Sequence, residues 1–300
     1  MAEWPAETKR RIHQIIKELP LPEKGYALDF GCGNGVLTNV LHEALPLWKI
    51  YGTDISITAV QNARVRYPGC TFFTSDESVL HQKQFDFLFS HHVFEHVFHL
   101  DQTFSEILEF LKPVSAMLHI LPCGNEGSYE HYICKLRKDG INTTQENRFF
   151  FEEEGHLRRL TSAEFTALCV ARQFTLQRQY YSNHYYGAVN WITGKSPVFI
   201  LKLTDFSKAV SDKARKKLKT ERIRLLLINV FRLPSIILSM LMNTKEKHAG
   251  HYMLMLMSLP LNIVSFPFHY YWNLRAIKEW NTIRQHHKGS EMFLFYTRSE

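Results

Sequence analysis

The stretch from Tyr26 to Leu41 constrains the fold of this chain more than any other feature of its sequence. Residues 26–30 form an apolar run that predicts a buried strand, residues 31–35 hold glycines in the spacing G-x-G-x-G, and residues 36–42 carry apolar side chains at helical spacing. Glycine permits positive φ and lets a ligand approach the backbone, and a helix N-terminus offers unpaired N–H groups. This order of elements predicts a ligand platform in an α/β fold.

Acidic residues stand beside this platform in the sequence. Asp29 lies two residues before the first glycine, and the next predicted strands, 48–55 and 71–75, end near Asp54 and Asp76. An acid about 20 residues after the glycine turn can bind a ribose diol. A dinucleotide fingerprint has the spacing G-x-G-x-x-G, whereas a carboxylate before G-x-G-x-G suits an amino or hydroxyl group better than a pyrophosphate. An adenosine cofactor is therefore predicted.

Short apolar strands alternate with helices along the first 182 residues. The further predicted strands are 85–90, 116–121 and 174–182. The predicted helices are 6–19, 56–67, which we expect Ser56 to cap, 101–111 and 162–172. Residues 123–150 are predicted to be a long polar connection that covers the strand ends. The alternation predicts a parallel sheet covered by helices, with ligands at the carboxyl ends of its strands.

The glycine turn, the acids at the strand ends and Glu95-His96-Val97 after the fourth strand resemble the class I S-adenosylmethionine-dependent methyltransferases, in particular the group that acts on small molecules and lipids. The resemblance covers roughly residues 20–180. It implies a Rossmann-like fold with a seven-stranded, mostly parallel sheet, and S-adenosylmethionine as cofactor. The chain departs from the family at residues 113–115, Pro-Val-Ser, where relatives usually have Pro-Gly-Gly.

The resemblance also implies which residues bind the cofactor. In the family the glycine turn holds the methionine part, and the acid that ends the third strand faces the adenine amino group, a position that Asp76 matches best. The predicted cofactor-binding residues are Asp29, Gly31, Cys32, Gly33, Gly35, Asp54, Ile55, Asp76, Glu77 and Ser90.

The residues after the fourth strand are the candidates for chemistry. Methyl transfer from a sulfonium requires the protein to position the acceptor and, for an oxygen or carbon acceptor, to remove a proton. We expect His92 to be the base, with Glu95 and His96 as a positioning pair or a shaped pocket wall, and His156 as a further candidate. Residues 92–96 also fit the zinc pattern H-x-x-E-H, but their place beside a nucleotide platform favours a site without metal.

The C-terminal part of the chain has a different character. Residues 183–290 contain 17 Lys and Arg against 5 Asp and Glu, which more than accounts for the net charge of +7. The segment 291–297 is the best candidate for the last strand of the sheet. We therefore expect a core at 1–182, an inserted apolar helical hairpin at 183–290 and a returning strand at 291–300.

Two apolar runs, 223–242 and 252–272, lie in this insertion and are each long enough to span a bilayer. Arg232, Pro260 and Pro267 interrupt them and favour a shallow hairpin in the interface, with the basic flanks near anionic headgroups. A spanning hairpin and an ordinary two-helix subdomain, packed on the sheet or on a second chain, stay open. Nucleic-acid binding is disfavoured because the apolar runs are too long for a solvated basic face.

The expected function is S-adenosylmethionine-dependent methylation of a membrane-associated or lipid-like acceptor at the cytoplasmic side of a membrane. The alternatives are a soluble sugar or small-molecule methyltransferase whose insertion forms a dimer interface, and a non-catalytic membrane-bound scaffold. Five scattered cysteines without a C-x-x-C pair predict reduced thiols, and the polar residues 1–11 show no secretory signal.

Overall fold

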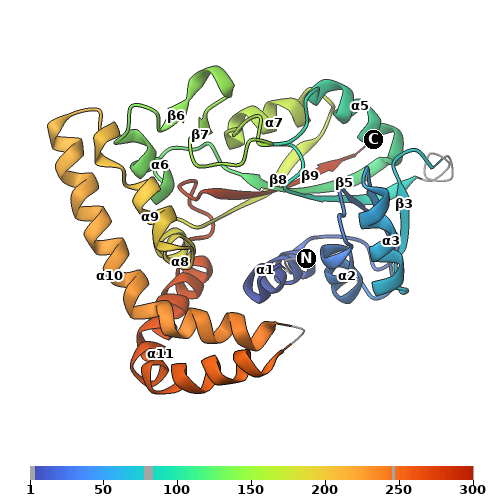
Figure 1. The fold of residues 1–300 in the computed structure, drawn as a ribbon. Coiled ribbons are helices and arrows are strands. Elements are labelled where there is room, and N and C mark those ends of the chain that lie inside the picture. The colour runs from blue at the N-terminus through green and yellow to red at the C-terminus, as the bar shows by residue number, and fades with distance from the viewer. Residues whose placement is uncertain (1–3, 78–83, 245–246, 300) are drawn as a thin grey trace. The chain divides into compact units, whose positions relative to one another are not determined.

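A seven-stranded sheet carries the candidate site in this computed structural model, which describes residues 4–77, 84–244 and 247–299 (Figure 1). The strands lie in the order β3-β2-β1-β4-β5-β9-β8. Their bounds are β1 Tyr26–Phe30, β2 Lys49–Asp54, β3 Thr71–Thr74, β4 Phe85–His91, β5 Leu111–Pro122, β8 Thr175–Ser182 and β9 Glu291–Arg298. The strands from β3 to β5 pair in parallel, which confirms the mostly parallel Rossmann-like sheet expected from the sequence.

Helices cover this sheet as the sequence predicts. Their bounds are α1 Ala6–Glu18, α2 Val36–Ala44, α3 Ile57–Arg66, α5 Leu100–Phe110 and α7 Ser162–Val170. Figure 1 shows α1 and α2 on one face of the sheet and α5 and α7 on the other. The hydroxyl of Ser56 accepts a hydrogen bond of 3.3 Å from the amide of Ala59, so Ser56 caps α3 as expected.

The register of the sheet brings three strand ends together. Phe30 at the end of β1 is paired with Thr53 of β2 on one side and with Ser90 of β4 on the other. Leu28 and Leu88 are fully buried, as expected of parallel strands covered on both faces. Because parallel strands run in the same direction, the segments 31–35 and 54–56 and the residues after β4 emerge at one edge.

The fifth strand is longer than the sequence predicts. The helix α5 ends at Phe110 and β5 begins at the next residue, so Lys112 and Pro113 belong to the strand instead of to a turn. The Lys112 ammonium lies 2.7 Å from Asp86 Oδ1, and the carbonyl of Pro113 accepts a hydrogen bond from Arg298 Nε at 2.9 Å. These contacts fix the start of the strand where a local sequence pattern predicts a loop.

The last strand of the sheet comes from the end of the chain. β9 lies between β5 and β8, which confirms the prediction that residues 291–297 return to the sheet after a long excursion. Met292, Leu294 and Phe295 are fully buried. The excursion therefore begins and ends on neighbouring strands.

The described chain divides into two compact units. The first holds 1–122, 162–179 and 292–300, and the second holds 123–161 and 180–291. Residues 123–161 thus belong with the C-terminal insertion, whereas the sequence analysis assigns them to the core. The predicted polar connection at 123–150 contains regular elements, namely α6 Tyr129–Lys135, β6 Ile141–Asn142, the 3-10 helix η1 Thr143–Gln145 and β7 Arg148–Phe149.

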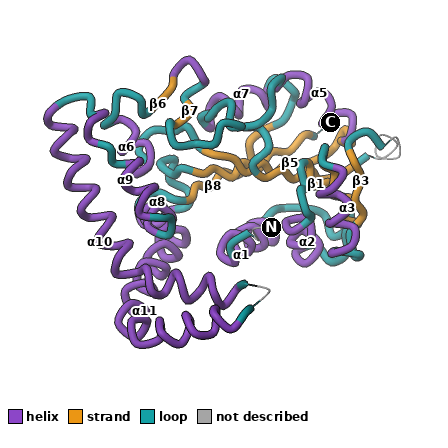
Figure 2. Tube along the Cα trace, viewed as in Figure 1, coloured by secondary structure: helices purple, strands orange, loops and turns teal. Residues whose placement is uncertain are grey.

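The second unit has a hydrophobic core of its own. Its other elements are α8 Tyr186–Thr193, α9 Pro197–Leu203, the 3-10 helix η2 Phe206–Lys208, α10 Asp212–Asn243 and α11 Ala249–Ile283. Tyr129 and Ile133 of α6 pack in one buried cluster with Val189 of α8, Ile200 of α9 and Leu218 of α10. This shared core explains why 123–161 joins the insertion, and Figure 2 shows that the unit is largely helical.

Candidate active site

The glycine turn after β1 is held in an unusual backbone conformation. Gly31, Gly33 and Gly35 have φ angles of 77°, 51° and 77°, in the left-handed region that favours glycine. The amides of Gly31 and Cys32 both donate hydrogen bonds of 2.9 Å to the carbonyl of Thr53. The turn is therefore fastened to the end of β2.

The three glycines have different surroundings. A Cβ at Gly31 would lie 2.4 Å from Val93 Cγ2, and a Cβ at Gly35 would lie 2.8 Å from the Phe72 ring. A Cβ at Gly33 would meet no described protein atom within 4 Å. Gly31 and Gly35 thus permit close packing, whereas the backbone at Gly33 faces space that a ligand can enter.

A cavity of about 690 Å³ opens at this edge of the sheet. It is lined by Phe30, Gly31, Thr53, Asp54, Ile55, Ser75, Asp76, His92, Val93, His96, Val97, Thr103, Glu106 and Phe110. All of these residues belong to the first unit. The cavity therefore collects residues from the ends of β1, β2, β3 and β4 and from α5, as the sheet register requires.

The charge of this cavity distinguishes between cofactors. Asp54, Asp76 and Glu106 contribute carboxylates, and among the described lining residues none is Lys or Arg. A hydrogen bond from the Thr74 side chain lowers the pKa of Asp76, which keeps it ionised. Such a lining suits a cofactor with positive charge and disfavours the anionic pyrophosphate of a dinucleotide. The residues present thus fit a sulfonium nucleoside.

Asp54 lines the cavity and is held by two backbone amides. Its Oδ2 accepts a hydrogen bond of 2.8 Å from the amide of Gly33, and its Oδ1 accepts one of 2.9 Å from the amide of Ser56. Each carboxylate oxygen keeps further acceptor capacity. Two backbone donors therefore orient the carboxylate that is predicted to hold the ribose hydroxyls.

Asp29 lies behind the glycine turn and does not line the cavity. It is 2 % exposed, and its Oδ2 accepts a hydrogen bond of 2.6 Å from the hydroxyl of Thr38. Burial raises the pKa of Asp29 to about 7, the Asp54 charge adds to this rise, and the Thr38 hydrogen bond opposes it. Its predicted contact with the cofactor stays a prediction.

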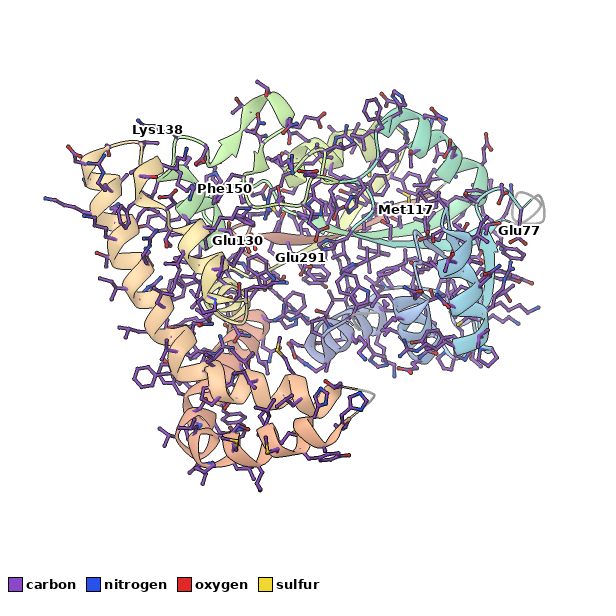
Figure 3. All side chains as sticks on the ribbon, in the orientation of Figure 1. Glu77, Met117, Glu130, Lys138, Phe150 and Glu291 are labelled. Carbon is purple, nitrogen blue, oxygen red and sulfur yellow. The ribbon has the colours of Figure 1, made fainter. Side chains whose placement is uncertain are left out.

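Five other predicted cofactor residues also lie outside the lining, namely Gly33, described above, and Cys32, Gly35, Glu77 and Ser90. Cys32 packs with Val60, Ala63 and Phe72 under the turn, and Gly35 is the N-cap residue of α2. The Glu77 carboxylate beside β3 accepts hydrogen bonds from Thr74 and Arg64 (Figure 3). The Ser90 hydroxyl bonds His119 Nδ1 at 2.7 Å inside the sheet. These contacts hold the walls of the site, whereas Gly31, Asp54, Ile55 and Asp76 face the cavity itself.

His92 and Glu95 form a pair at the end of β4. The Nδ1 atom of His92 lies 2.9 Å from Oε1 of Glu95, whose side chain is 1 % exposed. The φ angle of His92 is 55°, which is strained for a residue with a side chain. A buried carboxylate this close to Nδ1 favours a proton on that nitrogen, so that Nε2 can accept one, the arrangement expected of a general base.

The sequence analysis also names two further histidines, His96 and His156, as candidates for chemistry. His96 lines the cavity and is exposed, and residues 94–96 form a turn where the zinc pattern requires one helix. His156 belongs to the second unit, where its Nδ1 lies 3.6 Å from Glu152 Oε1. The catalytic roles predicted for His96 and His156 stay predictions.

Two parts of this site are not among the residues predicted from the sequence. The ring of Trp4, near the N-terminus, packs edge-on against His91 at a centroid distance of 4.5 Å and lies 6.0 Å from His92. Thr103, Glu106 and Phe110 line the cavity from α5. Their spacing of i, i+3 and i+7 places them on one helix face, and this spacing is the signal that could have found them.

Comparison with known proteins agrees with this geometry. A family model described as "Methyltransferase domain" matches residues 4–179. The chain belongs to this methyltransferase family. With its sheet topology, it is a class I methyltransferase, and the cofactor of this class is S-adenosylmethionine.

Individual relatives match over shorter stretches or with low identity. A trans-aconitate 2-methyltransferase of Variovorax paradoxus is 37 % identical over 70 residues, which cover 23 % of this chain and 27 % of that protein. The crystal structure of YcgJ from Bacillus subtilis aligns with a TM-score of 0.47 and 16 % identity, covering 69 % of this chain and 87 % of that one. The plantazolicin methyltransferase BpumL aligns with a TM-score of 0.46 and 13 % identity, covering 98 % and 86 %.

Proposed function

We propose that this methyltransferase uses S-adenosylmethionine to methylate a lipid-like acceptor held at the cytoplasmic surface of a membrane. The observation that carries the cofactor part is the acidic cavity around Asp54, beside a glycine whose backbone faces open space. When bound, the cofactor supplies an electrophilic methyl group on a sulfonium. Among the residues that line the cavity, Gly31, Asp54, Ile55 and Asp76 would hold it.

The pair of His92 and Glu95 supports removal of a proton from the acceptor. The Glu95 carboxylate lies 2.9 Å from Nδ1 and favours a proton there, and we assign Nε2 as the atom that takes the proton of a hydroxyl or an acidic carbon. Protonation gives a positive ring beside the buried Glu95 carboxylate, and this charge pair stabilises the product of the step. A nitrogen acceptor that is already neutral would need positioning only.

The second unit supports a membrane acceptor. Two helices, Asp212–Met242 and Ala249–Ile283, have the length and mean hydropathy of membrane segments, and only 28 % and 11 % of their most apolar windows are buried. Lys and Arg are concentrated in the N-terminal part of the first helix, between residues 213 and 224. An exposed apolar surface next to Lys and Arg suits an anionic lipid surface better than nucleic acid.

A labelled-cofactor assay tests the proposed activity. The protein is incubated with methyl-labelled S-adenosylmethionine and a total membrane lipid extract, and the organic phase is analysed by mass. We expect a labelled lipid with the unmodified protein and at least a 100-fold slower product formation with His92→Asn. Lack of label in any fraction would contradict catalysis and leave a scaffold role.

A soluble small acceptor is the second candidate. It is supported by the match of 70 residues to trans-aconitate 2-methyltransferase, which spans only 27 % of that relative. The same assay run on an aqueous metabolite extract separates the two candidates, because label that enters only the aqueous phase would replace the lipid acceptor by a soluble one.

A further inference from the structure

The middle of α10 is fixed to the rest of the second unit. Asn229 Nδ2 donates hydrogen bonds to the carbonyls of Thr193 and Lys195, at 2.8 and 3.1 Å. Arg232 is 2 % exposed, and its Nη1 donates to the carbonyl of Asn190 at 3.0 Å. This part of the apolar run therefore packs on α8 and is unavailable for crossing a bilayer.

The second half of α11 is fixed to the same helix. Glu279 is 7 % exposed and accepts hydrogen bonds from the amides of Tyr185, Tyr186 and Gly187, at 2.9, 2.7 and 3.0 Å. These are the amides at the N-terminus of α8, so the carboxylate caps that helix. Trp280 is also buried, which completes a compact base made by α8, α10 and α11.

Beyond this base, the two long helices continue as a hairpin. Figure 1 shows α10 changing direction along its length, and Pro234 lies inside the helix at a position that removes a backbone donor. The hydroxyl of the next residue, Ser235, donates to Asn262 Oδ1 at 2.7 Å and lies 2.9 Å from the hydroxyl oxygen of Ser265, also within hydrogen-bond distance. This buried polar seam joins the arms where the hairpin leaves the base.

The hairpin exposes large apolar side chains that no described part of the chain covers. The exposed members are Ile237, Met240, Met242, Tyr252, Met253, Leu254, Leu256, Met257, Leu259, Leu261, Ile263 and Val264. Leu256, Ile263 and Val264 are 69 %, 77 % and 74 % exposed. A surface this apolar on adjoining helices marks a site for a membrane or another protein.

The part of α10 beyond Pro234 is the shorter arm of the hairpin, and its length limits how deeply the hairpin can enter a bilayer. From Ser235 to Asn243 the arm has nine residues, or about 13 Å at the rise of an α-helix, whereas a bilayer core is about 30 Å thick. Lys247 and His248 stand close to the tip. Because the arm is too short to cross the core, a charged tip cannot reach the headgroups of the far leaflet. The tip is therefore most stable near the headgroups of the leaflet that the hairpin enters.

We propose that the described residues 235–244 and 247–265 form a monotopic anchor that lies in one leaflet of an anionic membrane and returns to the same side. The exposed Lys213, Lys216 and Lys219 on the first half of α10 provide the matching positive charge. This inference rests on the membrane association in the proposed function. It requires neither a methyl acceptor nor turnover, so the two can fail separately.

The test locates the hairpin tip with a thiol. Gly250 is exposed, and a Cβ there would meet no described atom within 4 Å, so Gly250→Cys adds a thiol without crowding. The variant is bound to sealed vesicles of phosphatidylcholine and phosphatidylglycerol, and an impermeant maleimide is added outside or trapped inside. We expect labelling from outside only. Labelling from inside, or protection from both reagents, would overturn the single-leaflet position.

Paired variants test the apolar surface. Leu256→Asp with Ile263→Asp should lower vesicle binding at least tenfold, while Val198→Asp, on α9 and 71 % exposed, should leave it unchanged. Cofactor binding, measured on each preparation, verifies that the first unit is folded. Unmodified protein that stays in the supernatant of anionic vesicles would overturn the proposal, and a concentration-dependent dimer in that sample would identify a second copy as the occupant.

Discussion

The amide of Gly33 donates a 2.8 Å hydrogen bond to Oδ2 of Asp54. This bond joins the glycine turn after β1 to the acid that ends β2, across the parallel pairing of the two strands. It places a carboxylate with remaining acceptor capacity beside a backbone that faces open space. The electrostatics of the cofactor site follow from this one contact and from the two further carboxylates that line the cavity.

The different roles of the glycines can be separated by substitution. Gly31→Ala places a methyl 2.4 Å from Val93 Cγ2, so it should lower the free energy of unfolding by about 1–3 kcal/mol, measured by urea denaturation. Gly33→Ala shares the positive φ, but its methyl meets no described atom within 4 Å, so its main effect should be weaker cofactor binding. Equal stability losses in both variants would contradict this division.

Asp29 should make stability depend on pH. Its folded-state pKa of about 7 lies above the unfolded value near 3.8, so the native chain binds more protons between these values. Stability contributed by this group is therefore lost as the pH rises from about 4 to 7, on the order of a few kcal/mol. Asp29→Asn keeps an acceptor for Thr38 and should flatten the dependence in urea titrations. An unchanged slope would show that Asp29 is not responsible.

Glu95 should act through His92. Glu95→Gln keeps the size of the side chain but removes the charge that stabilises a protonated ring. We expect product formation to fall about 100-fold with the cofactor dissociation constant unchanged. If Glu95 only shapes the wall of the pocket, the Glu95→Gln variant should instead show lower thermal stability and weaker cofactor binding, together with a normal rate once the site is saturated.

Trp4 should position the acceptor. Its ring contacts His91 and lies beside His92, and it is 38 % exposed, so a surface remains for an apolar ligand. Trp4→Ala should raise the KM for the extracted acceptor about tenfold, while Trp4→Phe retains most of the contact. Cofactor affinity should be the same in both. A change confined to kcat would contradict a positioning role.

The sequence predicts local features of this molecule better than distant ones. The glycine turn, the first four strands and the cap at Ser56 are encoded by neighbouring residues, and each is confirmed. The return of β9 was also predictable, because no segment soon after β8 has the pattern of a strand. Such signals depend on periodicity within a short window.

The remainder depends on contacts between remote segments. The seven-residue helix α6 is too short for a clear period, and it is stabilised by packing on α8 to α10. The proximity of Trp4 to His91 joins residues that are far apart in sequence. Ser90 and Cys32 were predicted to bind the cofactor, yet Ser90 bonds His119 and Cys32 packs under the glycine turn. A family motif indicates which positions lie near a site, but it does not tell which side chains face the cavity.

Calorimetric titration with S-adenosylmethionine tests the central claim most directly. The unmodified protein should bind one equivalent with micromolar affinity, and Asp54→Ala should abolish measurable binding because it removes the carboxylate fixed by Gly33 and Ser56. An absence of binding heat in the unmodified protein across several temperatures, or equal affinity in the variant, would contradict the account.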